Sequence, residues 1–335
     1  MSPKSALPTA LPTALPTAAT PPALPPGLHV FERGWLSSNC VLLDGLDGPN
    51  GGAALIDSGY TSHADQTVAL LEQALQGRAL RHLLNTHLHS DHCGGNAAVQ
   101  ARFPGVQTWI PPGQAEAARV WDEAALSFRA TGQRCPRFAF DALLHPGHTL
   151  ALGGLEWQLH AAPGHDPHAL LLYQPQQRVL ISGDALWPNG FGVVFPELDG
   201  EPGFVEVAAT LDCIEALAPQ WVIPGHGAVI SGAADVAQAL ARARSRLAQF
   251  ASSPERHREY AIKVLLKFRL LEWQRIGLAD FLAWAEGTPY LLQLHQRHGA
   301  GQPLRAWVQQ RIEALVQSQA ARLEPSPDGP WLLDA

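Results

Sequence analysis

The chain has 335 residues, 46% of them hydrophobic, so it exceeds one average domain and can bury a large core. Its net charge of −7 and its pI near 6.1 disfavour a protein that coats nucleic acid or an anionic membrane. Four scattered cysteines without a Cys-x-x-Cys pair favour reduced thiols over a disulfide framework. With no stretch of transmembrane length and no signal-peptide centre, we expect no membrane partner and a cytoplasmic location.

Residues 1–26 are rich in proline, and the unit Ala-Leu-Pro-Thr occurs three times there. Proline at this density interrupts helices and sheet ladders, and little apolar surface is available to offset the entropy of ordering. The sequence therefore predicts a disordered tail before the first domain.

Residues 27–232 show two runs of short apolar segments, each followed by a segment of helical periodicity. The predicted strands lie near residues 29–31, 39–43, 53–56, 80–84, 106–110, 150–152, 155–160, 169–173, 178–181 and 221–223. Helices are predicted near residues 64–76, 96–102, 114–121 and 204–217, while residues 122–145 are candidates for an insert over the site. This order fits two sheets packed together with helices outside.

Residues 233–335 are mainly helical in pattern. Helices are predicted over residues 233–250, 254–272, 278–285 and 303–323, with a strand near residues 331–333. Ser253 and Pro254 suit the N-cap and first position of the second helix. We predict a helical linker followed by a small winged-helix-like domain.

A chelating sequence, Thr-His-Leu-His-Ser-Asp-His-Cys-Gly-Gly, occupies residues 86–95, after a predicted buried strand and before a short helix. His87, His89, Asp91 and His92 fall within six positions, at a turn where glycines permit close backbone approach. Imidazole nitrogens and carboxylate oxygens are ligands for Zn²⁺, Fe²⁺ and Mn²⁺. Four chelating side chains at this spacing favour a metal site over a polar loop that is merely rich in histidine.

Three more polar residues stand beside glycines at predicted strand ends. They are His165 in Pro-Gly-His, Asp184 in Ser-Gly-Asp and His226 in Pro-Gly-His-Gly. Strand ends hold side chains on a rigid frame, so each is a candidate ligand. Each motif alone is weak evidence, and their recurrence in this order is the stronger signal.

Together these motifs resemble the metallo-β-lactamase superfamily over about residues 28–230. The resemblance implies an α+β fold, a four-layer αββα sandwich. It also implies seven ligands: His87, His89 and His165 on one metal, Asp91, His92 and His226 on the second, and Asp184 bridging them. Asp57 matches an early aspartate of the family that orients the metal loop.

The implied cofactor is a pair of divalent ions, with Zn²⁺ preferred and Mn²⁺ or Fe²⁺ as alternatives. Two such ions about 3.5–4 Å apart lower the pKa of a shared water toward 7, giving a bridging hydroxide that can attack an electrophilic carbonyl. Asp91 is the candidate catalytic residue because it could also accept a proton.

Two departures and one competing motif leave choices open. His148, in a second Pro-Gly-His, competes with His165, but His165 has the better distance to the Gly-Asp motif. Asp166 replaces the usual threonine or serine and is either a substrate-side acid or a polar turn residue. The apolar loop at residues 186–197 either shapes the pocket or packs between layers. Trp187 and Phe191 of this loop, together with His168 beside Asp166, are the tentative pocket residues.

The predicted C-terminal domain indicates which group within the superfamily the chain resembles. A metallo-β-lactamase domain followed by a winged-helix-like domain resembles the lactamase-β-like-2 group, which includes an endoribonuclease and thioester hydrolases. Lys263, Lys267 and Arg269 cannot all share one helical face, and no basic stripe with interleaved aromatics is evident. The region is therefore expected to act as a lid or a homodimer surface, and nucleic acid is not favoured as a partner.

We therefore expect a dinuclear metallohydrolase that acts on a small ester, thioester or lactone. One alternative is a metal-dependent endoribonuclease. Another is a mononuclear-iron enzyme like the persulfide dioxygenases, which uses the same ligands for redox chemistry.

Overall fold

Two six-stranded sheets form the centre of the molecule in this computed structural model, which describes residues 24–44 and 52–335. The predicted tail at residues 1–26 lies almost wholly outside these residues. The first sheet has its strands in chain order: β1 (Leu28–Phe31), β2 (Cys40–Leu43), β3 (Ala53–Ile56), β4 (Leu80–Leu84), β5 (Gln107–Ile110) and β6 (Ala142–Leu143). The pairs from β3 to β6 are parallel, so these strands end at the same edge.

The second sheet repeats this arrangement. Its strands, again adjacent in chain order, are β7 (Thr149–Leu152), β8 (Leu155–Ala161), β9 (Leu170–Gln174), β10 (Val179–Gly183), β11 (Trp221–Pro224) and β12 (Ile230–Ser231). β10 and β11 are parallel, whereas the other neighbours are antiparallel. The parallel pair brings the segments after both strands to one edge of the sheet.

Both faces of the central strands are buried, and their side chains alternate between two cores. In β3, Ile56 packs in the core between the sheets, whereas Leu55 faces the outer helices. In β10, Ile181 faces the other sheet and Leu180 faces outward. This alternation fixes which side of each strand faces the neighbouring sheet.

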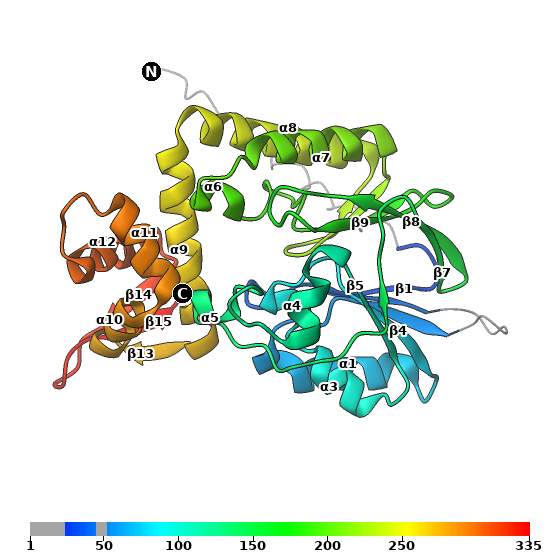
Figure 1. Ribbon diagram of the computed structural model, residues 1–335, viewed down its shortest axis with the longest axis horizontal. Helices are drawn as coiled ribbons and strands as arrows, with labels where there is room; N and C mark the ends of the chain where they lie inside the picture. The colour runs from blue at the N-terminus through cyan, green and yellow to red at the C-terminus, as the bar shows by residue number, and fades with distance from the viewer. Residues whose placement is uncertain (1–23, 45–51) are drawn as a thin grey trace, which may run out of the picture.

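Helices cover the outer face of each sheet, which gives the predicted four-layer αββα order (Figure 1). α1 (Ala64–Leu75) and α3 (Asn96–Arg102) cover the first sheet, and α7 (Phe204–Leu217) and α8 (Ala233–Ser252) cover the second. Shorter helices lie in the connections: α2 (Ser90–Cys93), α4 (Ala115–Val120), α5 (Phe128–Thr131), α6 (Phe195–Asp199) and the 3₁₀ turns η1 (Thr61–His63) and η2 (Pro112–Gln114).

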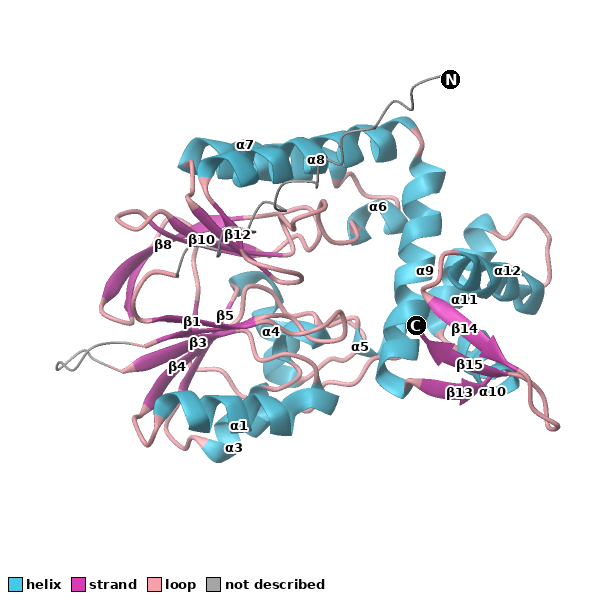
Figure 2. Ribbon diagram, turned by 180° about the vertical axis from the view of Figure 1, so that it is seen from behind, coloured by secondary structure: helices cyan, strands magenta, loops and turns pink. Residues whose placement is uncertain are grey.

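The C-terminal region lies at one end of the sandwich (Figure 2). Its long helix α9 (Pro254–Trp273) runs across the layers, from the end of α8 toward α5. It is followed by β13 (Arg275–Gly277), α10 (Leu278–Gly287), α11 (Pro289–His298), α12 (Leu304–Gln317), β14 (Ala321–Glu324) and β15 (Trp331–Asp334). The last three strands form a sheet in the order β13-β15-β14. None of the described helices is long and apolar enough to span a membrane.

The sequence prediction differs from the structure mainly in this region. A single helix was expected at residues 303–323, but α12 ends at Gln317 and residues 321–324 form strand β14. Helix α11 was not predicted at all. The alternation in β14 spans only four residues, too few to separate from a continuing helical pattern without the β15 partner.

Candidate metal centre

The chelating turn follows β4 directly and enters the short helix α2. Its two glycines allow the turn to pack tightly against the segment after β3. A Cβ atom on Gly94 would lie 2.4 Å from the Ser90 carbonyl oxygen, and one on Gly95 would lie 2.4 Å from that of Ser58. Because both oxygens belong to the backbone, a larger residue would displace the turn itself.

The other candidate ligands come from the second sheet, as the strand-end argument predicts. His165 follows β8, Asp184 follows β10, and His226 follows β11. Glycine is again required for close approach, because a Cβ atom on Gly225 would lie 2.2 Å from Asp184 Oδ1. The two sheets therefore deliver their ligands to one point from opposite sides.

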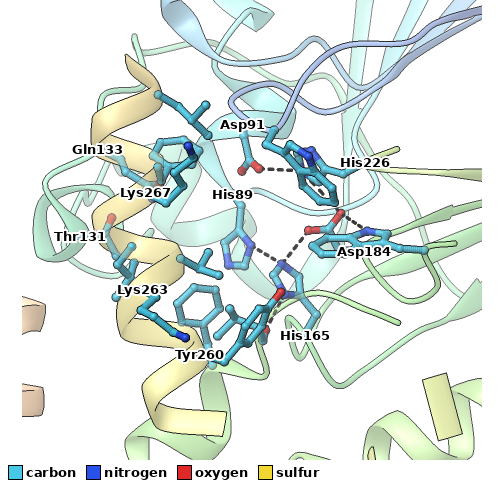
Figure 3. Close-up of a pocket in the computed structure, with 18 of the residues that line it drawn as sticks. His89, Asp91, Thr131, Gln133, His165, Asp184, His226, Tyr260, Lys263 and Lys267 are labelled. Carbon is cyan, nitrogen blue, oxygen red and sulfur yellow. Dashed lines mark hydrogen bonds and ion pairs between the residues drawn. The ribbon is translucent and has the colours of Figure 1, made fainter. Parts of the chain in front are cut away.

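All seven predicted ligands meet in one cluster, and five of them are labelled in Figure 3. Three overlapping groups have ligand atoms within 4.8 Å of one another: His87, His89 and His165; His87, His92 and Asp184; and Asp91, His92 and His226. Asp184 contacts one residue from each predicted ligand set. Its Oδ2 is 3.3 Å from His165 Nε2, and its Oδ1 is 3.3 Å from His92 Nε2.

The donor atoms fit divalent cations. Among the described residues, His87 Nε2 is buried without a hydrogen-bond partner, an unfavourable state that coordination would relieve. Burial lowers the pKa of His87 well below its usual value, and it lowers those of His89 and His165 to about 4. These three imidazoles are therefore neutral at neutral pH, which is the form that binds a metal.

Asp57 has the geometry expected of a residue that orients the metal loop. Its Oδ1 accepts a hydrogen bond from the Thr86 backbone N–H (2.9 Å). Its Oδ2 lies 2.8 Å from both Thr86 Oγ1 and His92 Nδ1. Because Asp57 holds His92 through Nδ1, the other ring nitrogen of His92, Nε2, is directed at the cluster. The backbone of Asp57 has a positive φ of 59° in this position.

The structure separates the two open choices near His165. His148 is exposed on the turn before β7 and lies outside the ligand cluster. Asp166 is buried, and its Oδ1 accepts a hydrogen bond from the His168 backbone N–H at 2.6 Å. Its Oδ2 is 3.7 Å from His89 Nε2, and it does not line the cavity beside the metal residues. Asp166 is thus a turn residue behind a ligand.

A cavity of about 300 Å³ opens onto the cluster. Its walls are mostly apolar, and Trp187 belongs to them, with Nε1 donating to Asp184 Oδ1 at 3.2 Å. The other two tentative pocket residues, His168 and Phe191, do not line this cavity. Phe191 is 1% exposed and packs on Phe250 in the core beneath the loop. His168 is exposed and packs against Gly113 on another surface.

The sequence suggested a lid or a homodimer surface for the C-terminal region, but it named none of the α9 residues that form this wall of the cavity. The α9 residues that line it are Tyr260, Lys263, Val264, Leu265, Lys267, Phe268 and Leu271. Most of them recur at helical spacing on one face, so the periodicity was visible, but nothing in the sequence indicated what this face would contact. The predicted insert also contributes through Ser127, Thr131 and Gln133. Trp35, 56% exposed, stacks on His226 at the rim.

Two buried polar contacts attach α9 to the sandwich. The Glu272 carboxylate, 3% exposed, pairs with Arg134 and Arg269 and accepts a hydrogen bond from Tyr60 Oη (3.2 Å). Toward the other end of α9, His257 Nε2 accepts a hydrogen bond from the Val194 backbone N–H at 3.0 Å. These contacts fix the wall relative to the metal ligands.

Comparison with known proteins agrees with this architecture. A model of the metallo-beta-lactamase superfamily matches residues 33–226. Hydroxyacylglutathione hydrolases of Anaeromyxobacter dehalogenans and Thermosynechococcus vestitus are similar, at 36% identity over 142 residues and 32% over 176 residues. These alignments cover 42% and 52% of this chain and 45% and 58% of the relatives, so the chain spans about half the length of the curated relatives it matches.

A crystal structure of a beta-lactamase domain protein from Burkholderia ambifaria is also similar. It has a TM-score of 0.55 at 21% identity, with 96% of each chain covered, and this likeness concerns the fold alone. The family model covers more than half of the chain, and its matched residues contain all seven clustered side chains. The chain therefore belongs to the metallo-beta-lactamase superfamily.

Proposed function

We propose that this protein is a dinuclear metal-dependent hydrolase of small acyl thioesters, with esters and lactones as related substrates. The observation that carries the proposal is the convergence of two ligand groups around Asp184, beside an apolar cavity. The similarity to enzymes named hydroxyacylglutathione hydrolase supports a thioester as the substrate class.

The ligand groups suggest a division of roles. His87, His89 and His165 would hold one ion, Asp91, His92 and His226 the other, and Asp184 would contact both. When bound, divalent ions supply Lewis acidity and lower the pKa of a coordinated water toward 7. Zn²⁺ is the first candidate for this ligand set, with Mn²⁺ and Fe²⁺ as alternatives.

Asp91 is the proposed proton acceptor. Burial alone would raise its pKa, but His92 and His226 outweigh that effect and hold the pKa below the usual value. Its Oδ2 lies 3.0 Å from His226 Nε2 and the residue lines the cavity. The side chain is thus ionised at neutral pH and lies where a substrate would bind.

The apolar cavity favours the hydrolase over the nuclease alternative. A single-stranded nucleic acid needs a positively charged track with stacking platforms along the bound strand. The described cavity instead encloses about 300 Å³ between aromatic and aliphatic side chains, which suits one small acyl group. The division at residues 232 and 233, the winged-helix-like assignment, the homodimer and the cytoplasmic location all stay predictions.

The decisive experiment measures metal content and activity on the same preparation. Protein purified without added metal should carry two zinc or manganese ions per chain and hydrolyse a model thioester, and a chelator should abolish both. One iron per chain with oxygen consumption on a persulfide substrate would overturn the proposal. Nucleotide release from single-stranded RNA, lost in His226→Ala, would favour the nuclease.

A further inference from the structure

The α9 wall of the cavity carries a cation, Lys263, that has no counter-ion among the residues that the structure describes. Lys263 and Lys267 lie one turn apart on the face directed at the cavity, and Figure 3 shows both extending from the side of α9 nearest the metal ligands. Lys4, Lys263 and Lys267 are the only lysines in a chain whose other 20 basic residues, 23 minus 3, are arginines. Two of the three therefore line one cavity.

The two lysines differ in their contacts. Lys267 Nζ pairs with the Asp334 carboxylate and also donates to the Ala320 carbonyl oxygen, so the fold itself neutralises it. Within residues 24–44 and 52–335, Lys263 makes no hydrogen bond or ion pair, and it is half-buried. A partly desolvated ammonium without a partner is unfavourable unless a ligand supplies the anion.

The described residues around Lys263 supply no such anion, so a bound ligand would have to supply it. The acidic residues that line the described cavity are Asp91 and Asp184, and both belong to the metal cluster. The α9 residues around Lys263 are apolar or aromatic: Tyr260, Val264 and Phe268. An anion bound here would meet low-dielectric walls, where its attraction to the ammonium is stronger than in water.

We infer that Lys263 binds an anionic group of the substrate, distant from the scissile carbonyl, and thereby selects acyl thioesters with a carboxylate or phosphate at one end. The inference rests on the proposed function for the position of the scissile bond. The substrate would then have three parts: a carbonyl at the metal ligands, an apolar body between the aromatic walls, and an anion at α9. A lysine whose stem merely packs on apolar surface would give no preference for charge.

The test compares matched substrates on each protein. A thioester with a terminal carboxylate is measured against its carboxamide isostere and a phosphate-bearing counterpart. The wild type should prefer an anionic substrate by about tenfold in kcat/KM, mainly through KM, which corresponds to about 1.4 kcal/mol. The charged group giving the larger ratio separates carboxylate from phosphate recognition.

Variants assign this preference to Lys263. In Lys263→Met the ratio of charged to uncharged substrate should fall to about one, and Lys263→Arg should restore most of it. Because the ratio is taken within one protein, partial misfolding cancels. Arg256→Met is the matched control: it removes an exposed cation two turns earlier on α9, outside the cavity, and should keep the wild-type ratio.

Binding of non-hydrolysable thioether analogues, measured by calorimetry, separates this inference from the proposed function. If thioesters are hydrolysed but charged and uncharged forms react equally, or if Lys263→Met keeps the preference, the inference is wrong while the hydrolase assignment stands. If no thioester is hydrolysed but the charged thioether still binds more tightly through Lys263, the inference stands and the hydrolase assignment fails.

Discussion

The two sides of the cavity are built in different ways. The metal side consists of polar residues that follow β4, β8, β10 and β11, and the glycines beside them leave no room for a larger residue. The opposite side is one face of α9, a helix that belongs to the C-terminal region. It contacts the sandwich through buried polar contacts near its two ends and through apolar packing on Val193 and Tyr60.

This difference suggests that the metal side determines reactivity and that the α9 side determines substrate selectivity. Strand ends within a packed sandwich hold ligand atoms rigidly, as coordination requires. A helix attached at its ends can exchange the side chains on its inner face without disturbing the metal ligands. We therefore expect changes on the metal side to abolish activity, and changes on the α9 side to alter stability or substrate choice.

The largest effect is expected from Asp184→Ala. This variant removes the carboxylate that contacts both ligand groups, so kcat/KM for a model thioester should fall by about 1,000-fold or more. Metal analysis should show fewer than two ions per chain. An active variant with full metal content would show that Asp184 is not a bridging ligand.

The next largest effect concerns the attachment of α9. Glu272→Gln leaves the buried Arg269 guanidinium without its counter-charge, which should lower the free energy of unfolding by about 3 kcal/mol. Urea denaturation measures this change. Glu286→Gln on α10 is the control, because both side chains of its pair with Arg305 are exposed to solvent and the pair should contribute less than about 1 kcal/mol. Equal effects of the two substitutions would contradict the attachment role.

A smaller effect is expected from Asp57, which orients a proposed metal ligand without binding the metal itself. Asp57→Asn keeps an acceptor for Thr86 but weakens the hold on His92 Nδ1, so metal affinity should fall about 10- to 100-fold. Competition with a chromophoric chelator measures this affinity. Asp44→Asn, a substitution of an aspartate outside the ligand cluster, should leave it unchanged. An unchanged affinity in Asp57→Asn would assign that residue to folding alone.

The smallest effect is a pH dependence of the free energy of unfolding, caused by His257 on α9. Burial lowers the pKa of His257 to about 4, below the value near 6.5 expected in the unfolded chain. The unfolded state therefore binds the proton first, and the stabilisation present above pH 6.5 is lost as the pH falls toward 4. Between pH 8 and 5.5 this loss amounts to about 1.4 kcal/mol.

Unfolding by urea at both pH values, for the wild type and for His257→Gln, isolates this contribution. Glutamine can still accept the hydrogen bond of the Val194 backbone N–H but does not titrate. The difference in unfolding free energy between the two pH values should be smaller in the variant. An identical pH dependence in both proteins would exclude His257 as its source.

The sequence by itself determined the chemistry of the metal side. His87, His89, Asp91 and His92 are close in the chain, so their spacing alone brings them together at one turn. His165, Asp184 and His226 were found because each stands beside a glycine at the end of a predicted strand. The order of predicted strands and helices likewise indicated two sheets packed together with helices outside.

Only the tertiary structure decided what faces these ligands. Phe191 and Trp187 belong to the same apolar loop, yet one is buried in the core and the other lines the cavity. The sequence shows which helical face carries Lys263, but it does not show which surface that face contacts. Such contacts join residues far apart in the chain, and they depend on how whole elements pack, which local periodicity does not encode.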